Sequence, residues 1–226
     1  MTTTMEQRTF DWYRARLGQF NASTIGDLMV KGRGKDEVFG KTALAVIGQV
    51  AYERLLNPLV VEDDDVFGEY LEQTDITSRA MRWGVENEPI ARDLYSSTMG
   101  TEVVETGSMR HPDLPMLSAS PDGLVGDDGL VEIKCVGAAS YMRFINVTDG
   151  ATLKAIEPKY YWQIQCQLSV TDRQWCDFVV YNPFVVAPLH IARIWRNLAD
   201  ISAMLERVVL AEDIANELTT KAKQRR

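Results

Sequence analysis

The pattern of apolar and polar positions divides the chain into helical segments, a run of strands, and a second set of helices and strands. Apolar residues at helical spacing predict helices over about 10–17, 21–29, 41–56 and 75–99. Asn21 or Ser23 is the expected N-cap of the second helix, and Pro89 is expected to kink the fourth or to start a new segment. Apolar stretches bounded by Gly and Pro then predict strands over about 101–111, 117–125 and 130–136.

The same pattern continues with helices over 138–147 and 159–171 and strands over 175–182 and 188–194. From about Arg196, apolar residues at helical spacing predict a long amphipathic helix that covers a sheet or forms an oligomer contact: Met204, Val208, Ala211, Ala215 and Leu218. This order of elements predicts an α+β (mixed α/β) fold with a mixed central sheet flanked by helices.

Domain organisation is expected to be simple, because no Pro/Ser-rich linker or internal repeat divides the 226 residues. We expect a single domain over 1–226. Its core would span about 75–195, and the C-terminal amphipathic helix about 196–222.

Composition limits the cellular compartments in which the protein is expected and the metals that it could bind. The N-terminus lacks the apolar stretch of a signal peptide and the longest apolar runs are too short to span a bilayer, so we expect no membrane association. Three cysteines without C-x-x-C spacing suggest reduced thiols in a cytoplasm. Because the chain has only two histidines, a zinc site is not expected. Any metal would be held by oxygen ligands, which favours Mg²⁺ or Mn²⁺.

The net charge of −8 does not exclude a nucleic-acid partner, because it is unevenly distributed. Residues 57–75 carry seven acidic and no basic side chains, which leaves the rest of the chain at −1, with 24 basic against 25 acidic residues. Affinity for phosphate depends on a local patch and not on the charge of the whole surface. The acidic segment itself is predicted to be a solvated loop, with a partner-binding or DNA-excluding role as the alternative.

An unusual group of charges lies in the predicted strand at 130–136. Side chains alternate faces along a strand, so Glu132 and Lys134 point one way while Val131, Ile133 and Cys135 point into the core. Asp122, in the turn Pro-Asp-Gly that begins the preceding strand, comes beside them if the two strands pair. Asp122 and Glu132 could then bind one Mg²⁺ with Lys134 alongside. On spacing alone, a surface hairpin with solvated charges is an equal alternative.

Two other segments could extend this site. Glu88, within a predicted helix, would supply a third carboxylate, although Glu86 fits equally well by spacing. Gln163 and Gln167 share one face of a helix whose other positions are largely apolar. A surface glutamate and a surface polar stripe are the alternatives.

The order of these motifs resembles the phage lambda exonuclease family, also called the YqaJ-type viral recombinases, within the PD-(D/E)xK nuclease superfamily. The motifs are G-x-x-x-E-P-x-A at 84–91, S-P-D-G at 120–123, E-I-K at 132–134 and Q-I-Q at 163–165. "WYRARLGQFNAS" at 12–23 is similar to the family's W-x-x-x-R-x-G-x-x-T-A-S, with Asn21 where the family tends to have Thr. The resemblance runs from about residue 12 to 195, most of the chain.

The resemblance implies a restriction-endonuclease-like core and a set of site residues. Asp122, Glu132 and the backbone carbonyl of Ile133 would hold the catalytic Mg²⁺, for which Mn²⁺ could substitute. Glu88 would hold a second metal or its waters. Lys134 would be the catalytic lysine. Gln163 would lie close to the scissile phosphate.

The resemblance also implies a substrate and an assembly. Arg16 and Ser23 match the pair that holds a 5′-terminal phosphate, and Met81 falls where the family places an apolar wedge that splits the duplex end. The family forms ring-shaped homotrimers that thread double-stranded DNA and digest one strand from 5′ to 3′. They usually work with a single-strand annealing protein, in the bacterial cytoplasm, with phage or prophage origin. The alternatives are an endonuclease or junction resolvase on the same core, or a non-catalytic DNA clamp.

Overall fold

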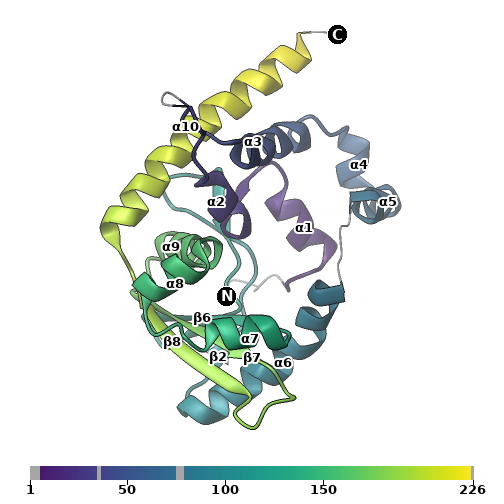
Figure 1. Ribbon diagram of the computed structural model, residues 1–226. Helices are drawn as coiled ribbons and strands as arrows, with labels where there is room; N and C mark the ends of the chain where they lie inside the picture. The colour runs from purple at the N-terminus through teal and green to yellow at the C-terminus, as the bar shows by residue number, and fades with distance from the viewer. Residues whose placement is uncertain (1–5, 35–36, 75–78, 225–226) are drawn as a thin grey trace.

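The computed structural model, shown in Figure 1, describes residues 6–34, 37–74 and 79–224. Its helices are α1 (Phe10–Arg16), α2 (Ala22–Leu28), α3 (Lys41–Glu53), α4 (Pro58–Glu62), α5 (Asp64–Thr74), α6 (Arg79–Met99), α7 (Ala138–Phe144), α8 (Gly150–Ile156), α9 (Pro158–Thr171) and α10 (Leu198–Lys223). Its strands are β1 (Phe20–Asn21), β2 (Val103–Val104), β3 (Met109–Arg110), β4 (Leu117–Ala119), β5 (Gly123–Val125), β6 (Gly129–Cys135), β7 (Trp175–Tyr181) and β8 (Leu189–Trp195).

The larger sheet has the strand order β2-β5-β6-β7-β8 and mixed direction. β6 and β7 are parallel, and the other neighbouring pairs are antiparallel. Helices cover both of its faces, as Figure 1 shows, with α7, α8 and α9 on one side and α6 on the other. Buried β6 side chains therefore alternate between two cores, with Leu130 packed in the core that includes α9 and Val131 in the core beneath α6.

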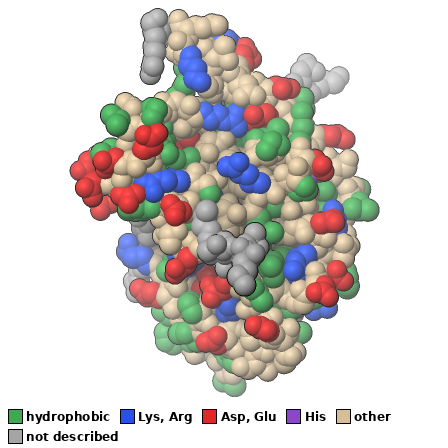
Figure 2. Space-filling model, turned by 180° about the vertical axis from the view of Figure 1, so that it is seen from behind, with side chains coloured by type: hydrophobic (Ala, Val, Ile, Leu, Met, Phe, Trp, Pro, Cys, Tyr) green, Lys and Arg blue, Asp and Glu red, His purple; other side chains and the backbone are tan. Residues whose placement is uncertain are grey.

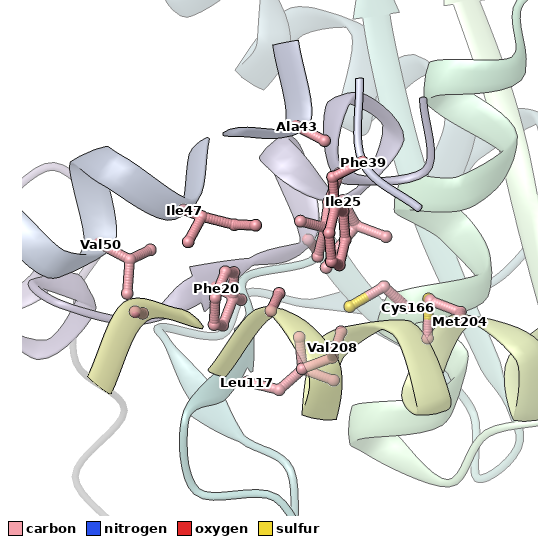
Figure 3. Close-up of a cluster of buried hydrophobic side chains, with 14 of the residues drawn as sticks. Phe20, Ile25, Phe39, Ala43, Ile47, Val50, Leu117, Cys166, Met204 and Val208 are labelled. Atoms are coloured by element: carbon pink, nitrogen blue, oxygen red, sulfur yellow. The ribbon is translucent and has the colours of Figure 1, made fainter. Parts of the chain in front are cut away.

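A smaller sheet, of order β1-β4-β3, lies within a second packing unit. α2, α3, α9 and α10 surround it and share one apolar core, part of which is drawn in Figure 3. Phe20 from β1 and Leu117 from β4 are fully buried there. α9 contributes both to this core and to the core of the larger sheet, so it links the two sheets.

The predicted fold class is confirmed, because mixed sheets flanked by helices make up the structure. The long C-terminal helix is also present as α10, and its apolar side packs against α3 and α9. Within the described residues, no helix combines the length and apolar character needed to cross a membrane.

The acidic segment differs from its prediction, because most of it forms the helices α4 and α5 instead of a loop. Asn57 caps α4, Pro58 occupies its first turn, and Asp64 and Asp65 lie in the first turn of α5, where the helix dipole favours negative charge. The buried ring of Phe67 anchors α5, with the Arg14 guanidinium of α1 4.7 Å from the ring centroid. The Phe67 ring and the ion pair of Arg14 with Asp64 therefore hold α5 against α1.

Two smaller predictions left alternatives open. Of the two expected at Pro89, a new segment is wrong, because α6 runs through it to Met99. The proline is on the exposed side of the helix, where solvent can satisfy the carbonyl that loses its partner. Of the two expected N-caps of α2, Asn21 is confirmed and Ser23 is inside the helix, although the Asn21 side chain makes no capping hydrogen bond.

Candidate active site

Asp122 and Glu132 face each other across two antiparallel strands. β5 pairs with β6 in a register that places Gly123 opposite Val131, so the preceding residue, Asp122, comes opposite Glu132. The Ile133 backbone N–H donates a hydrogen bond of 2.7 Å to Asp122 Oδ2. This contact fixes the orientation of the carboxylate. The predicted pairing is confirmed for 123–125 with 129–131, whereas 117–119, expected in the same strand, forms β4 in the smaller sheet. The strand expected over 101–111 is likewise divided, into β2 of the larger sheet and β3 of the smaller one.

Glu132 is almost completely buried, with 1% of its surface exposed. Gln163 Nε2 donates to its Oε1 at 2.6 Å, and Gln167 Nε2 donates to its Oε2 at 2.6 Å. The two glutamines are one helical turn apart on α9, which packs over this face of β6. The amide stripe is therefore not on the surface; it satisfies a carboxylate that would be costly to bury alone.

Lys134 completes the group from the same face of β6. Its Nζ lies 2.5 Å from Glu132 Oε1 and 3.5 Å from Gln163 Oε1, and 4.6 Å from the centre of the Tyr160 ring. Burial lowers the pKa of Lys134, but the carboxylates of Glu132 and Asp122 outweigh it and raise that pKa above its ordinary value. The side chain is therefore held as an ammonium ion.

The charge balance around Asp122 fits a cation. Burial, followed by the carboxylates of Glu132 and Glu88, raises the pKa of Asp122 well above its usual range. A divalent ion between Asp122 and Glu132 would relieve this repulsion, and an all-oxygen donor set suits Mg²⁺ or Mn²⁺. Yet in the described part of the chain, no three acidic, histidine or cysteine side chains converge closely enough to hold one ion. The fit therefore rests on the facing pair of carboxylates.

Glu88 is the buried glutamate of α6, whereas its rival Glu86 is exposed. Both Glu88 oxygens are engaged by arginines, Oε2 by Arg8 at 2.6 Å and Oε1 by Arg92 at 2.8 Å. The structure thus places Glu88 near enough to influence Asp122 without bringing it into a shared ligand set. Sequence reasoning missed both arginines. No spacing rule relates residue 8 to residue 88, but the i,i+4 spacing of Glu88 and Arg92 on one helix was a signal that could have identified Arg92.

The two predicted phosphate-binding residues are in contact. Arg16 Nη2 donates to Ser23 Oγ at 3.2 Å, and Arg16 Nη1 donates to Ser120 Oγ at 3.3 Å. Trp12 Nε1 donates to the same Ser120 hydroxyl at 3.0 Å, and the Arg16 guanidinium lies 4.2 Å from the centre of the Trp12 ring. Burial lowers the pKa of Arg16 to about 10, so it remains a cation at neutral pH.

We call this group around a single arginine the arginine cluster; it consists of Trp12, Arg16, Ser23 and Ser120. The chain connects it directly to the carboxylate pair. Ser120 comes two residues before Asp122 and was not singled out from the sequence, although it lies within the S-P-D-G motif. Asn21, the departure from the family pattern, accepts a hydrogen bond of 2.7 Å from Ser118. A cavity of about 440 Å³ opens beside Trp12, Arg16 and Asn21. Arg16 therefore lies next to the turn that carries Asp122, although the residues that line the cavity beside it do not include Asp122 or Glu132.

Met81, the predicted wedge, is at the start of α6 and more than half exposed. It lies on the same helix as Glu88, about 10 Å along the helix axis for seven residues at 1.5 Å each. The structure therefore places Met81 on the site's own helix but not in the carboxylate or arginine cluster.

Comparison with known proteins identifies relatives of the chain. Residues 11–174 match the model of the YqaJ-like viral recombinase domain. The structure is similar to an alkaline exonuclease, LHK-Exo, from Laribacter hongkongensis, with 30% identity, a TM-score of 0.76, and coverage of 96% of this chain and 97% of that one. A second LHK-Exo structure, in complex with dAMP, has 30% identity, a TM-score of 0.73 and coverage of 96% and 100%.

A more distant structure supports the fold alone. A phage-related exonuclease from Haemophilus somnus is 17% identical, with a TM-score of 0.66 and coverage of 90% of this chain and 96% of that one. No curated protein matches the sequence.

Proposed function

Because the chain belongs to the YqaJ-like viral recombinase domain family, we propose that it is a Mg²⁺-dependent 5′–3′ double-strand DNA exonuclease. It would degrade one strand from a duplex end and leave a 3′ single strand for phage-type recombination. LHK-Exo has been captured with dAMP, a deoxynucleoside monophosphate, which is the class of product this reaction would release.

The observation that carries the proposal is the buried Glu132 carboxylate, held by Lys134, Gln163 and Gln167 and facing Asp122. A solvated hairpin would not bury a glutamate and supply it with three hydrogen-bond donors. Such a fixed set of charged groups is what phosphodiester hydrolysis needs.

Each residue would have a separate task. Asp122, Glu132 and the Ile133 carbonyl would hold Mg²⁺, for which Mn²⁺ could substitute, with Glu88 engaged through water. When bound, the ion would supply an activated water and offset charge on a phosphoryl oxygen. The Lys134 ammonium would orient that water or stabilise the pentavalent phosphate. Gln163, which contacts both Glu132 and Lys134, would keep them in register beside the scissile phosphate.

The arginine cluster would bind the end of a DNA duplex, which would make the enzyme an exonuclease. Arg16 and Ser23, with the Ser120 hydroxyl between them and Asp122, would bind a 5′-phosphate and so place the first phosphodiester at the carboxylates. Met81 would separate the strands there. We further propose a homotrimer that works with a single-strand annealing protein in the bacterial cytoplasm.

Digestion of DNA by matched variants tests this function. Linear duplex with 5′-phosphate ends should be degraded in Mg²⁺ but not in EDTA, while closed circular duplex stays intact. Asp122→Ala and Glu132→Ala should abolish hydrolysis, because each removes a metal ligand. Lys134→Ala should be nearly inactive yet still bind Mg²⁺ in calorimetry. Substantial hydrolysis by Glu132→Ala would contradict the assignment of Glu132 as a metal ligand. Cleavage of the closed circular duplex would indicate an endonuclease.

A further inference from the structure

The loop between β7 and β8, residues 182–188, presents apolar side chains to solvent. Phe184 is 82% exposed, and Val186 is fully exposed. A large apolar side chain in water contributes little burial to the fold, and contiguous exposed apolar groups often mark a binding surface. The Phe184 ring is therefore available to contact a further group.

The loop is held in place by several contacts. The Asn182 side chain donates to Val136 O at 2.9 Å and accepts from the Phe184 backbone N–H at 2.9 Å. The Tyr141 hydroxyl of α7 donates to the Ala187 carbonyl. Pro183 and Pro188 restrict the backbone on either side of the apolar residues. The exposed ring is thus presented by an anchored backbone.

Phe184 stacks on Trp83 of α6. The ring centroids are 5.7 Å apart and the planes differ by 23°, an offset-parallel arrangement. Trp83 overlaps only part of the phenyl ring, and most of the Phe184 side chain is open to solvent. Such a pair can accept one more planar group on the open side.

Trp83 and Phe184 are on segments that adjoin the candidate active site, the first on the helix of Glu88 and the second in the loop after β7. Trp83 precedes Glu88 on α6 by five residues, or about 7.5 Å along the axis. The loop continues from the carboxyl end of β7, where Tyr181 pairs with Cys135, the residue after Lys134. Figure 1 shows the β7–β8 connection at the same end of the sheet as α7 and the first half of α6.

We propose that Trp83 and Phe184 form a stacking platform for unpaired bases of the strand that is not hydrolysed. The inference rests on the proposed exonuclease function, which leaves bases without partners at the mouth of the site. An unpaired base offers a planar face, and stacking on an aromatic ring is tolerant of sequence, as an enzyme that moves along any DNA requires. A rigid ring already stacked on its inner side loses little freedom when a base binds.

The test measures single-strand binding without metal, which separates it from catalysis. A fluorescent oligothymidine is titrated with wild-type protein and with Phe184→Ala, Phe184→Leu, Phe184→Tyr and Val186→Ala in EDTA. Phe184→Ala and Phe184→Leu should bind about tenfold more weakly, because each removes the ring. Phe184→Tyr should bind like wild type. Val186→Ala, in the same loop and more exposed, is the matched control and should bind like wild type.

The following results would contradict the inference. Wild-type affinity in Phe184→Ala excludes a role for the ring, and wild-type affinity in Phe184→Leu shows that only apolar contact matters. A change in oligomeric state of Phe184→Ala in light scattering, with single-strand affinity retained, would assign the loop to a contact between copies. If wild-type protein fails to hydrolyse duplex in Mg²⁺, the proposed function fails. If it hydrolyses duplex but Phe184→Ala binds single strands normally, only the platform fails.

Discussion

At the scale of single residues, Glu132 shows how the site depends on matched partners. A carboxylate at 1% exposure is stable only when hydrogen bonds replace its lost hydration, and two amides and an ammonium do so here. Gln167, fully buried, leaves its own Oε1 without a hydrogen-bond partner among the described protein groups. An unsatisfied buried amide oxygen costs free energy. The chain thus tolerates a local cost to fix the second oxygen of Glu132.

Arg16 gives a prediction at the same scale. Its planar guanidinium can donate two parallel hydrogen bonds to a terminal phosphate, and such charge-assisted contacts contribute roughly 1.5–3 kcal/mol each. Arg16→Ala should therefore lower the rate on 5′-phosphorylated ends by about tenfold to a hundredfold. It should also lose the preference for 5′-phosphate over 5′-hydroxyl ends. The measurement compares initial rates of both proteins on both ends.

Arg14→Ala is the matched control, because Arg14 is on the same helix but pairs with Asp64 of α5. It removes the same charge and should keep the wild-type preference. Equal slowing of both substrates by Arg16→Ala, with the preference intact, would show that Arg16 does not read the phosphate.

At the scale of elements, the sequence predicted correctly which residues share one face of a strand. It did not predict which helix packs over that face. Strand alternation placed Glu132 and Lys134 together, and the turn placed Asp122 beside them, because both follow from local geometry. That α9 covers the pair, with Gln167 on one carboxylate oxygen, depends on packing between distant segments. The ion pair of Glu88 with Arg8 was beyond reach for the same reason, whereas its pair with Arg92 follows the local i,i+4 spacing of one helix.

Close packing of α2 against α9 gives a prediction at this scale. A Cβ added to Gly26 of α2 would lie 2.5 Å from the Lys159 Cα of α9, a backbone atom that cannot move alone. Gly26→Ala should therefore lower the free energy of unfolding by about 1–3 kcal/mol, despite the better helix propensity of alanine. Urea unfolding followed by tryptophan fluorescence measures the change.

Gly48→Ala is the control, since Gly48 is also helical, in α3, and an added Cβ meets nothing within 4 Å. It should raise the free energy of unfolding by roughly 0.5–1 kcal/mol. If both substitutions stabilise the protein, α2 and α9 are not as close as the structure places them.

At the scale of the whole molecule, negative charge is densest along one segment, residues 57–75. Figure 2 shows acidic side chains gathered at the margin where α4 and α5 lie, while the arginine cluster lies beside Ser120, in the S-P-D-G turn that also carries Asp122. These acidic helices border the Arg16 cavity, because Tyr70, Glu72 and Thr74 of α5 line it together with Arg16. Their negative charge would keep DNA from binding along α4 and α5 and leave Arg16 as the place for a terminal phosphate. The alternative role for α4 and α5 is contact with another copy.

The proposed ring assembly can be tested by its effect on DNA digestion. If three copies form the ring proposed above, the duplex passes through it and cannot leave by a single local dissociation. The protein should then elute as a trimer in light scattering, and α10 together with α4 and α5 are the candidate contacts. It should also digest one labelled DNA molecule to completion when excess unlabelled DNA is added after the reaction has begun. Glu132→Ala should form the same trimer, because the carboxylate is buried within one chain. A monomer that transfers to the unlabelled DNA after each cleavage would refute the ring.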